Sequence, residues 1–203
     1  DIFKNTTKPW TEIKNIVFMG MGEPLDNYEN LAEAIKVFSD PWGFNLAPKK
    51  ITVSTVGHLP GLKKILDFSI PISLAISIHA ANDKLRSKIM PINRKYPLSE
   101  LIEIIRQFNK KRKCSVLIQY ILLKGVNDSS AHAQELIHLL KDVQIKVNLI
   151  PYNTVQDRRF IPPDLDTIKK FQHSLLKNDI RTMVRFSKGS DIMGACGQLY
   201  QKS

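Results

Sequence analysis

The chain has 203 residues, 43% of them hydrophobic, so it is long and apolar enough to bury a substantial core and is not a disordered chain. Its formal net charge is 30 − 19 = +11, which favours a polyanionic partner, with RNA or DNA ahead of a membrane lipid. Two cysteines exclude a disulfide framework and a four-thiolate metal site, and no apolar run reaches the roughly 20 residues that span a bilayer.

Short apolar runs recur along the chain and predict strands at residues 13–19, 51–55, 72–78, 116–123, 147–150 and 182–186. Several runs are apolar at nearly every position, which is typical of parallel strands covered on both faces. Between the runs, apolar residues recur with helical spacing, as at Leu98, Leu101, Ile102 and Ile105. Cap residues agree with these helices, for example Asp164 after two prolines.

Alternating strands and helices predict an α/β fold with a parallel sheet. The pattern leaves two architectures open, a doubly wound open sheet and a barrel or partial barrel. A complete eight-unit barrel takes about 250 residues, so the six units found here predict an incomplete one.

In both architectures, ligands bind at the carboxyl ends of the strands. Small or polar residues lie at or just beyond this end of most of the predicted strands: Gly20, Gly22, Glu23, Ser54, Ser77, His79 and Asn153. The pattern therefore predicts a ligand site on this rim.

Each candidate also has a structural interpretation. The two glycines turn the chain or let a ligand approach the backbone. Glu23 binds a ligand ammonium group or caps the helix that follows it. His79 is a hydrogen-bonded rim histidine, a base or a ligand, and Asn153 is a turn residue or reads a purine edge. No second histidine, cysteine or carboxylate lies at metal-ligand spacing, so no metal site is predicted.

The two cysteines have different surroundings. Cys114 begins a strand and is predicted to pack as a small hydrophobic residue. Cys196 lies between Ala195 and Gly197, with basic residues nearby, which favours an accessible thiolate. A nucleophilic role for Cys196 and a buried structural role are both open on this evidence.

Seven segments, in order, resemble the RlmN/Cfr family of radical S-adenosylmethionine RNA methyltransferases. They are residues 19–25 (MGMGEPL), 54–57 (STVG), 77–79 (SIH), 90–93 (MPIN), 125–128 (GVND), 148–153 (NLIPYN) and 195–199 (ACGQL). The resemblance implies a partial TIM-like (β/α)6 radical SAM barrel over residues 1–203, with a C-terminal extension. It further implies cytoplasmic methylation of adenine C2 in 23S rRNA and tRNA, or of C8 in the Cfr branch. Pro24 and Pro151 are more similar to the RlmN branch.

The family's functional residues are assigned to the positions of this sequence that match its motifs. Cys196 resembles the methyl-accepting cysteine, and Gly22 and Glu23 match the segment that holds the methionine amino group. The remaining S-adenosylmethionine contacts match Ser54, Ser77, Ile78, His79 and Asn153. The resemblance also implies a [4Fe-4S] cluster and a reductant such as flavodoxin.

One departure from the family is large, because its three cluster cysteines, spaced C-x3-C-x2-C, are missing. We expect these cysteines, the first strand, the cluster loop and an N-terminal RNA-binding domain to precede Asp1. This chain alone is then expected to bind no cluster and to be inactive. The strand at 13–19 becomes an exposed edge through which the fragment self-associates. The rival classes are an α/β enzyme that binds a phosphate-bearing ligand and a non-catalytic RNA-binding module.

Overall fold

The computed structural model describes residues 13–154 and 159–186. Strands and helices alternate along this part of the chain. In order they are β1 (Ile16–Phe18), α1 (Tyr28–Ser39), β2 (Ile51–Thr55), α2 (Leu59–Asp67), β3 (Ser73–Ser77), α3 (Asp83–Ile89), α4 (Leu98–Arg112), β4 (Val116–Leu122), α5 (Ser130–Leu139), β5 (Ile145–Pro151), α6 (Leu165–Leu176) and β6 (Thr182–Val184). Short 3-10 turns precede α1, β2 and α4. All six predicted strands are present, and the second has the predicted bounds.

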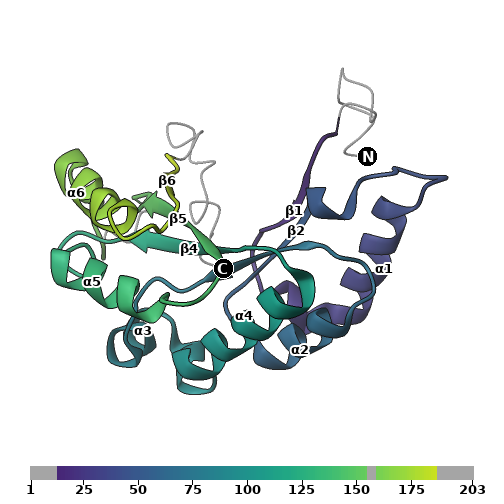
Figure 1. The fold of residues 1–203 in the computed structure, drawn as a ribbon, viewed down its shortest axis with the longest axis horizontal. Coiled ribbons are helices and arrows are strands. Elements are labelled where there is room, and N and C mark those ends of the chain that lie inside the picture. Colours follow the sequence, from purple (N-terminus) through teal and green to yellow (C-terminus); the bar gives the residue numbers. More distant parts are fainter. Residues whose placement is uncertain (1–12, 155–158, 187–203) are drawn as a thin grey trace.

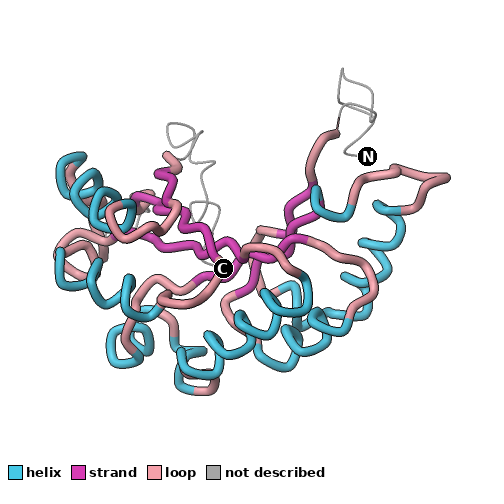
Figure 2. The backbone as a smooth tube through the Cα atoms, viewed as in Figure 1, coloured by secondary structure: helices cyan, strands magenta, loops and turns pink. Residues whose placement is uncertain are grey.

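The six strands form one parallel sheet in the order β1-β2-β3-β4-β5-β6. The sheet is curved, and the helices lie along its convex side (Figure 1; strands magenta and helices cyan in Figure 2). Sequential strand order with helices on one side is the arrangement of a partial barrel, whereas a doubly wound sheet reverses its order and has helices on both faces. The partial barrel is confirmed, and the expectation that both faces are covered is wrong for the described helices.

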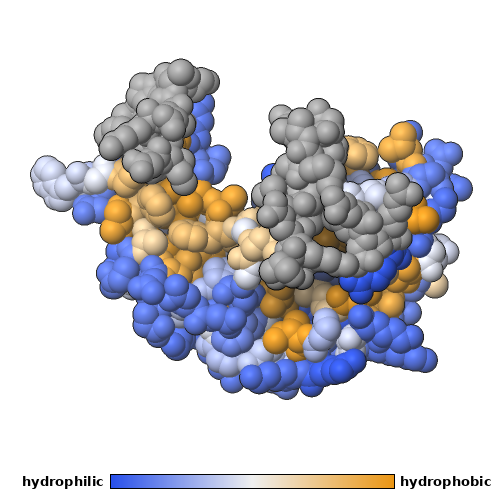
Figure 3. Space-filling model, turned by 180° about the vertical axis from the view of Figure 1, so that it is seen from behind, coloured by the Kyte–Doolittle hydropathy of each residue, from blue (hydrophilic) through white to orange (hydrophobic). Residues whose placement is uncertain are grey.

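The core fills the space between the convex face of the sheet and the helices. Alternate strand residues such as Val53, Ile76 and Ile118 are fully buried there. Tyr120 of β4 packs on Phe171 of α6, with the ring centroids 5.4 Å apart. The predicted apolar stripe on α4 is buried along its whole length. Hydrophilic residues cover much of the outer surface of the molecule (Figure 3). Burial of these apolar surfaces is the main force that holds the helices on the sheet.

The helix starts follow the caps expected from the sequence. Ser129 accepts a hydrogen bond from the His132 backbone N–H, and the two residues form a capping box at the start of α5. Asp164 accepts a hydrogen bond from the Thr167 N–H at 2.8 Å and caps α6 in the same way.

The concave face carries the other half of the alternating strand residues. At one level, the register places Ser77, Gln119, Asn148 and Met183 side by side on β3, β4, β5 and β6. We call these four residues the concave row. The row leads from the carboxyl end of β3 into the middle of the sheet, so it connects the predicted rim to the inside of the barrel.

Strand β1 lies at one edge of the sheet. It is shorter than the predicted run, and its central residue, Val17, is 57% exposed. Phe18 packs against Phe38 of α1, with the ring centroids 6.4 Å apart, which fixes the edge strand on the first helix. The exposed edge agrees with the expectation from the sequence, while self-association through it stays a prediction.

Candidate functional site

The carboxyl ends of the strands bring most of the predicted site residues to one rim. Gly22 and Glu23 lie in the loop after β1, Ser54 is the fourth residue of β2, and Ser77 ends β3. The other members follow strands directly: Ile78 and His79 follow β3, and Asn153 follows β5. This agrees with the predicted common rim, because parallel strands present their carboxyl ends at the same edge of the barrel.

Glu23 joins the loop after β1 to the end of β2. Its Oε1 accepts a hydrogen bond from the Leu25 N–H at 3.1 Å and so caps the 3-10 turn Pro24–Asn27. Its Oε2 accepts one from the Val56 N–H at 2.8 Å. The helix-cap interpretation of Glu23 therefore holds. A carboxylate has about four acceptor positions, so both oxygens retain capacity for an ammonium group.

The glycine loop before Glu23 is open. A methyl group added to Gly20 or Gly22 meets no heavy atom within 4 Å. Gly22 has φ +87°, a conformation that residues with a side chain rarely adopt, so the backbone requires glycine there. Met21, between them, is 68% exposed. This loop accommodates a ligand lying directly against the backbone.

The fully buried Arg86 of α3 holds the ends of β2 and β3 together. Its Nη2 donates to the carbonyl oxygens of Val56 at 2.7 Å and Ser77 at 3.1 Å, and its Nε donates to that of Ile78 at 3.1 Å. The Nη1 donates to Asn93 Oδ1 at 2.8 Å. Burial lowers the pKa of Arg86 to about 10, opposed by the nearby Asp83 carboxylate, so the guanidinium stays charged at neutral pH.

Asn93 extends this contact to the next helix. Its Nδ2 donates to Asp83 Oδ1 at 2.9 Å, and that oxygen also accepts the backbone N–H of Leu98, the first residue of α4. We call this group of three residues, Arg86, Asn93 and Asp83, the Arg86 cluster. No role was predicted for it from the sequence. Asn93 belongs to the 90–93 motif, but nothing in the sequence shows that it is buried or that it binds Arg86.

His79 adopts a left-handed backbone conformation with φ +59° immediately after β3. Its Nδ1 accepts a hydrogen bond from the Ile121 N–H at 3.1 Å, so in the neutral ring the proton is on Nε2. Burial, together with the positive charge of Arg86, lowers the pKa of His79 to about 4, although the Gln119 backbone favours the charged form. His79 is therefore neutral at pH 7 and fixes β3 against β4 by accepting a backbone hydrogen.

Asn127 connects the backbone at the end of β4 to the backbone that follows β3. Its Nδ2 donates to the carbonyl oxygens of His79 at 2.8 Å and Ile121 at 2.7 Å, while its Oδ1 accepts the Leu123 N–H at 2.7 Å. The Tyr120 hydroxyl donates to the Asn127 carbonyl oxygen at 2.9 Å. Asn127 belongs to the 125–128 motif, for which no function beyond a strand end was predicted.

The remaining predicted residues have different surroundings. Ser54 is buried, and the Ile78 side chain is fully buried in the core, so Ile78 faces the rim only with its backbone. The Ile78 N–H donates to the Gln119 carbonyl oxygen at 3.0 Å. Asn153 is partly buried beyond β5. Cys196, the predicted methyl-accepting residue, lies outside the described residues.

The residues present fit S-adenosylmethionine better than they fit an iron-sulfur cluster. The Glu23 carboxylate and the open glycine loop suit a ligand with an ammonium group and a backbone-facing edge. Within residues 13–154 and 159–186, no three histidine, cysteine, aspartate or glutamate side chains are grouped to hold a metal ion. Cys114 precedes β4, at the opposite end of the strands, and burial raises the pKa of its thiol.

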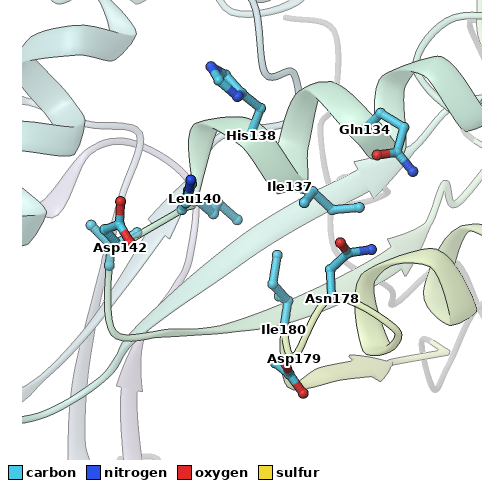
Figure 4. Close-up of a pocket in the computed structure, with 10 residues that line it drawn as sticks. Gln134, Ile137, His138, Leu140, Asp142, Asn178, Asp179 and Ile180 are labelled. Carbon is cyan, nitrogen blue, oxygen red and sulfur yellow. The ribbon is translucent and has the colours of Figure 1, made fainter.

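A pocket of about 500 Å³ lies away from this rim. It lies between the end of α5 and the loop before β6, as Figure 4 shows, and its lining includes Ile137, Asp142 and Asn178. These segments lead into the amino ends of β5 and β6, so the pocket is separate from the predicted site. In the described part of the chain, no helix is both long and apolar enough to cross a bilayer.

Comparison with known proteins agrees with this geometry. Residues 8–147 match the model of the radical SAM superfamily. A probable dual-specificity RNA methyltransferase RlmN 1 of Protochlamydia amoebophila is 46% identical over 92% of this chain and 52% of its own length. The dual-specificity RNA methyltransferase RlmN of Nautilia profundicola is 43% identical over 93% of this chain and 53% of its own length. The chain thus spans about half the length of the curated relatives it matches.

A solved structure has the same arrangement of elements. It is the radical SAM methyltransferase of Sphaerobacter thermophilus, with a TM-score of 0.89 and 41% identity over 91% of this chain and 54% of that one. One conclusion follows from the match over residues 8–147, and the sequential parallel sheet agrees with it. The chain belongs to the radical SAM superfamily.

Proposed function

We propose that this chain is the S-adenosylmethionine-binding barrel of an RNA methyltransferase that modifies C2 of adenine in 23S rRNA and tRNA. The observation that carries the proposal is the gathering of the motif residues, from Gly22 to Asn153, on one rim of a radical SAM fold. The names of the RlmN relatives support RNA as the substrate, and the formal charge of +11 suits a polyanion.

The chain's own residues bind and orient in this proposal. Glu23, held by two backbone N–H groups, pairs with the ammonium group of the cofactor. Ser54 and Ser77 offer hydroxyl groups, and Asn153 an amide, along the same rim. Arg86 and His79 are positioning residues, because both bind the strand ends that carry Ser77 and Ile78.

Bound S-adenosylmethionine, together with a cluster, supplies the methyl group and the radical chemistry needed at a carbon that is neither acidic nor nucleophilic. The cluster requires cysteines beyond the two in this sequence, so no step through it is assigned to these residues. Cys196 is proposed to carry the methyl group, as the resemblance implies.

The test is methylation by the protein joined to the cluster-binding segment that the family resemblance requires. The joined protein is incubated anaerobically with S-adenosylmethionine, a flavodoxin reducing system and a 23S rRNA fragment or tRNA. We expect 2-methyladenosine in the nucleoside digest, abolished by Cys196→Ala and retained by the matched control Cys114→Ala. A digest with 8-methyladenosine identifies the Cfr type of activity instead, and RNA binding without any methylated product supports a non-catalytic binding module.

A further inference from the structure

Two amide side chains, Gln119 and Asn148, lie next to each other on the concave face. They are register partners on β4 and β5, in the middle of the concave row. The chain neighbours of both residues are fully buried on the convex side, so alternation directs the two amides into the barrel. Gln119 is 6% and Asn148 3% exposed.

The hydrogen-bonding capacity of these amides is largely unused in the described part of the chain. Gln119 Nε2 lies 3.5 Å from the sulfur of Met19, which is a weak acceptor. The Asn148 side chain makes no hydrogen bond to any described residue. Among the described residues, His58 Nδ1 is the side-chain nitrogen or oxygen that is buried without a partner, so the unbonded amide atoms of Gln119 and Asn148 still reach the inside of the barrel and are open to a ligand. Two adjacent amides in this state indicate a partner of complementary hydrogen-bonding pattern.

The position and charge of the pair narrow the class of partner. Ser77 lies beside Gln119 in the row, so the pair adjoins the predicted cofactor residues, most of which are on the β1–β3 side. Met183 continues the row on the other side of Asn148. The four residues of the row carry no charge, which suits a neutral, planar ligand rather than a phosphate.

We propose that Gln119 and Asn148 form the subsite for the target base and hold an adenine ring by its N6 and N7 edge. This inference rests on the proposed function and names the part of the site that recognises its substrate. Amide side chains match adenine in this way, because an amide accepts from N6–H while it donates to N7. The base reaches the barrel by leaving its stack, as in other enzymes that act on a base.

This orientation has a consequence for the position modified. C8 adjoins N7, so an amide on N7 obstructs it, whereas C2 lies on the opposite side of the ring and is left free. The amide pair therefore favours modification at C2 over C8.

The experiment measures RNA binding by the 203-residue chain with fluorescence anisotropy. One hairpin carries a single unpaired adenine, a second carries purine there and lacks the N6 amino group, and a third carries 7-deazaadenine and lacks N7. We expect the wild-type chain to bind the adenine hairpin roughly tenfold more tightly than either analogue. Gln119→Leu and Asn148→Leu, which nearly conserve volume, are expected to reduce this preference to less than about twofold.

Three controls distinguish a loss of base recognition from unfolding and from a change in cofactor binding. Gln107→Leu, on the exposed side of α4, is expected to keep the full preference. Asn148→Ser and Gln119→Met repeat the test if a leucine variant fails to show a cooperative thermal transition. Equilibrium dialysis with S-adenosylmethionine is expected to show equal affinity for the wild-type chain and the variants.

Specific results overturn the inference. It is wrong if the variants keep the tenfold preference, or if they weaken S-adenosylmethionine binding and leave the RNA preference intact, because the pair then serves the cofactor. It is also wrong if the wild-type chain binds all three hairpins equally, a result that leaves the proposed function standing. A wild-type chain that binds none of the hairpins also overturns the subsite inference, whereas the proposed function is tested separately by methylation with the joined protein.

Discussion

The ends of β3 and β4 and the loop after β1 belong to the same rim, but they are held in place differently. At β3 and β4, the buried side chains of Arg86 and Asn127 donate hydrogen bonds directly to backbone carbonyl oxygens. At β1, the loop through Gly20 and Gly22 has open space around it and is joined to its neighbour by Glu23.

This difference indicates how the site divides its work. We expect the β3–β4 side, whose backbone is held by buried side chains, to keep its shape on ligand binding and so to orient a ligand without a further ordering cost. On the β1 side, we expect the loop with Gly20 and Gly22 to adjust to the ligand, because glycine has few backbone restrictions. The Glu23 carboxylate there supplies the electrostatic attraction. The following predictions test this division, from the largest expected effect to the smallest.

Removal of Arg86 is expected to have the largest effect. Arg86→Met keeps most of the aliphatic volume but leaves the carbonyl oxygens of Val56, Ser77 and Ile78 without their donor. We expect the free energy of unfolding, measured by urea denaturation, to fall by about 3–5 kcal/mol, because several charge-assisted hydrogen bonds are lost and their acceptors stay buried. Arg106→Met is the control, because Arg106 is exposed and paired only at 3.7 Å with Glu103, and its loss should cost less than about 1 kcal/mol. Equal losses in both variants would contradict a rigid β3–β4 side.

Acid is expected to weaken the same side through His79. Its pKa is about 4 in the folded chain and about 6.5 in the unfolded chain, so between these values the unfolded state binds more protons. The contribution is fully present above pH 6.5 and is lost as the pH falls towards 4, by on the order of 3 kcal/mol.

The measurement is urea denaturation of wild-type, His79→Asn and His173→Asn chains from pH 4 to pH 8. Asparagine tolerates the left-handed backbone of position 79 and keeps an acceptor for the Ile121 N–H, so His79→Asn should flatten this part of the pH profile. His173 is exposed on α6, and its replacement should leave the slope unchanged. A profile that keeps its slope in His79→Asn would refute the assignment to His79.

The smallest effects are expected in the β1 loop. Gly22→Ala forces a side chain into φ +87° and should cost about 1 kcal/mol, whereas Gly20→Ala has neither a positive φ nor a steric neighbour and should change stability by less than about 0.5 kcal/mol. Thermal unfolding of the two variants distinguishes them. A loss above 2 kcal/mol for Gly20→Ala would show that this loop is packed, and would remove the contrast between the two sides.

The sequence was sufficient for the positions of the strands and for the rim, because both depend on local patterns, whereas the strand order distinguishes the two architectures that these patterns left open. Apolar runs located the strands, and residues at their ends located Glu23, Ser77 and His79. The Arg86 cluster could not be predicted, because a basic residue on a charged helix is normally solvated and its acceptors lie 30 residues away at Val56 and 9 away at Ser77. The one-sided cover of the sheet was also missed, since inner residues such as Leu117 and Ile150 make the strands apolar on both faces.

The order of the sheet has a consequence for how the molecule forms. Each strand pairs with the strand that follows it in the chain, so every pairing closes a single crossover and none needs a distant segment. Pairing between consecutive strands closes a shorter loop than pairing between distant ones, which lowers the entropic cost of each step. The sheet is therefore able to lengthen during synthesis, as each new β/α unit docks on the one already folded. Because Arg86 of α3 binds the backbone after β2 and the end of β3, its burial joins the third unit to the strand of the unit before it.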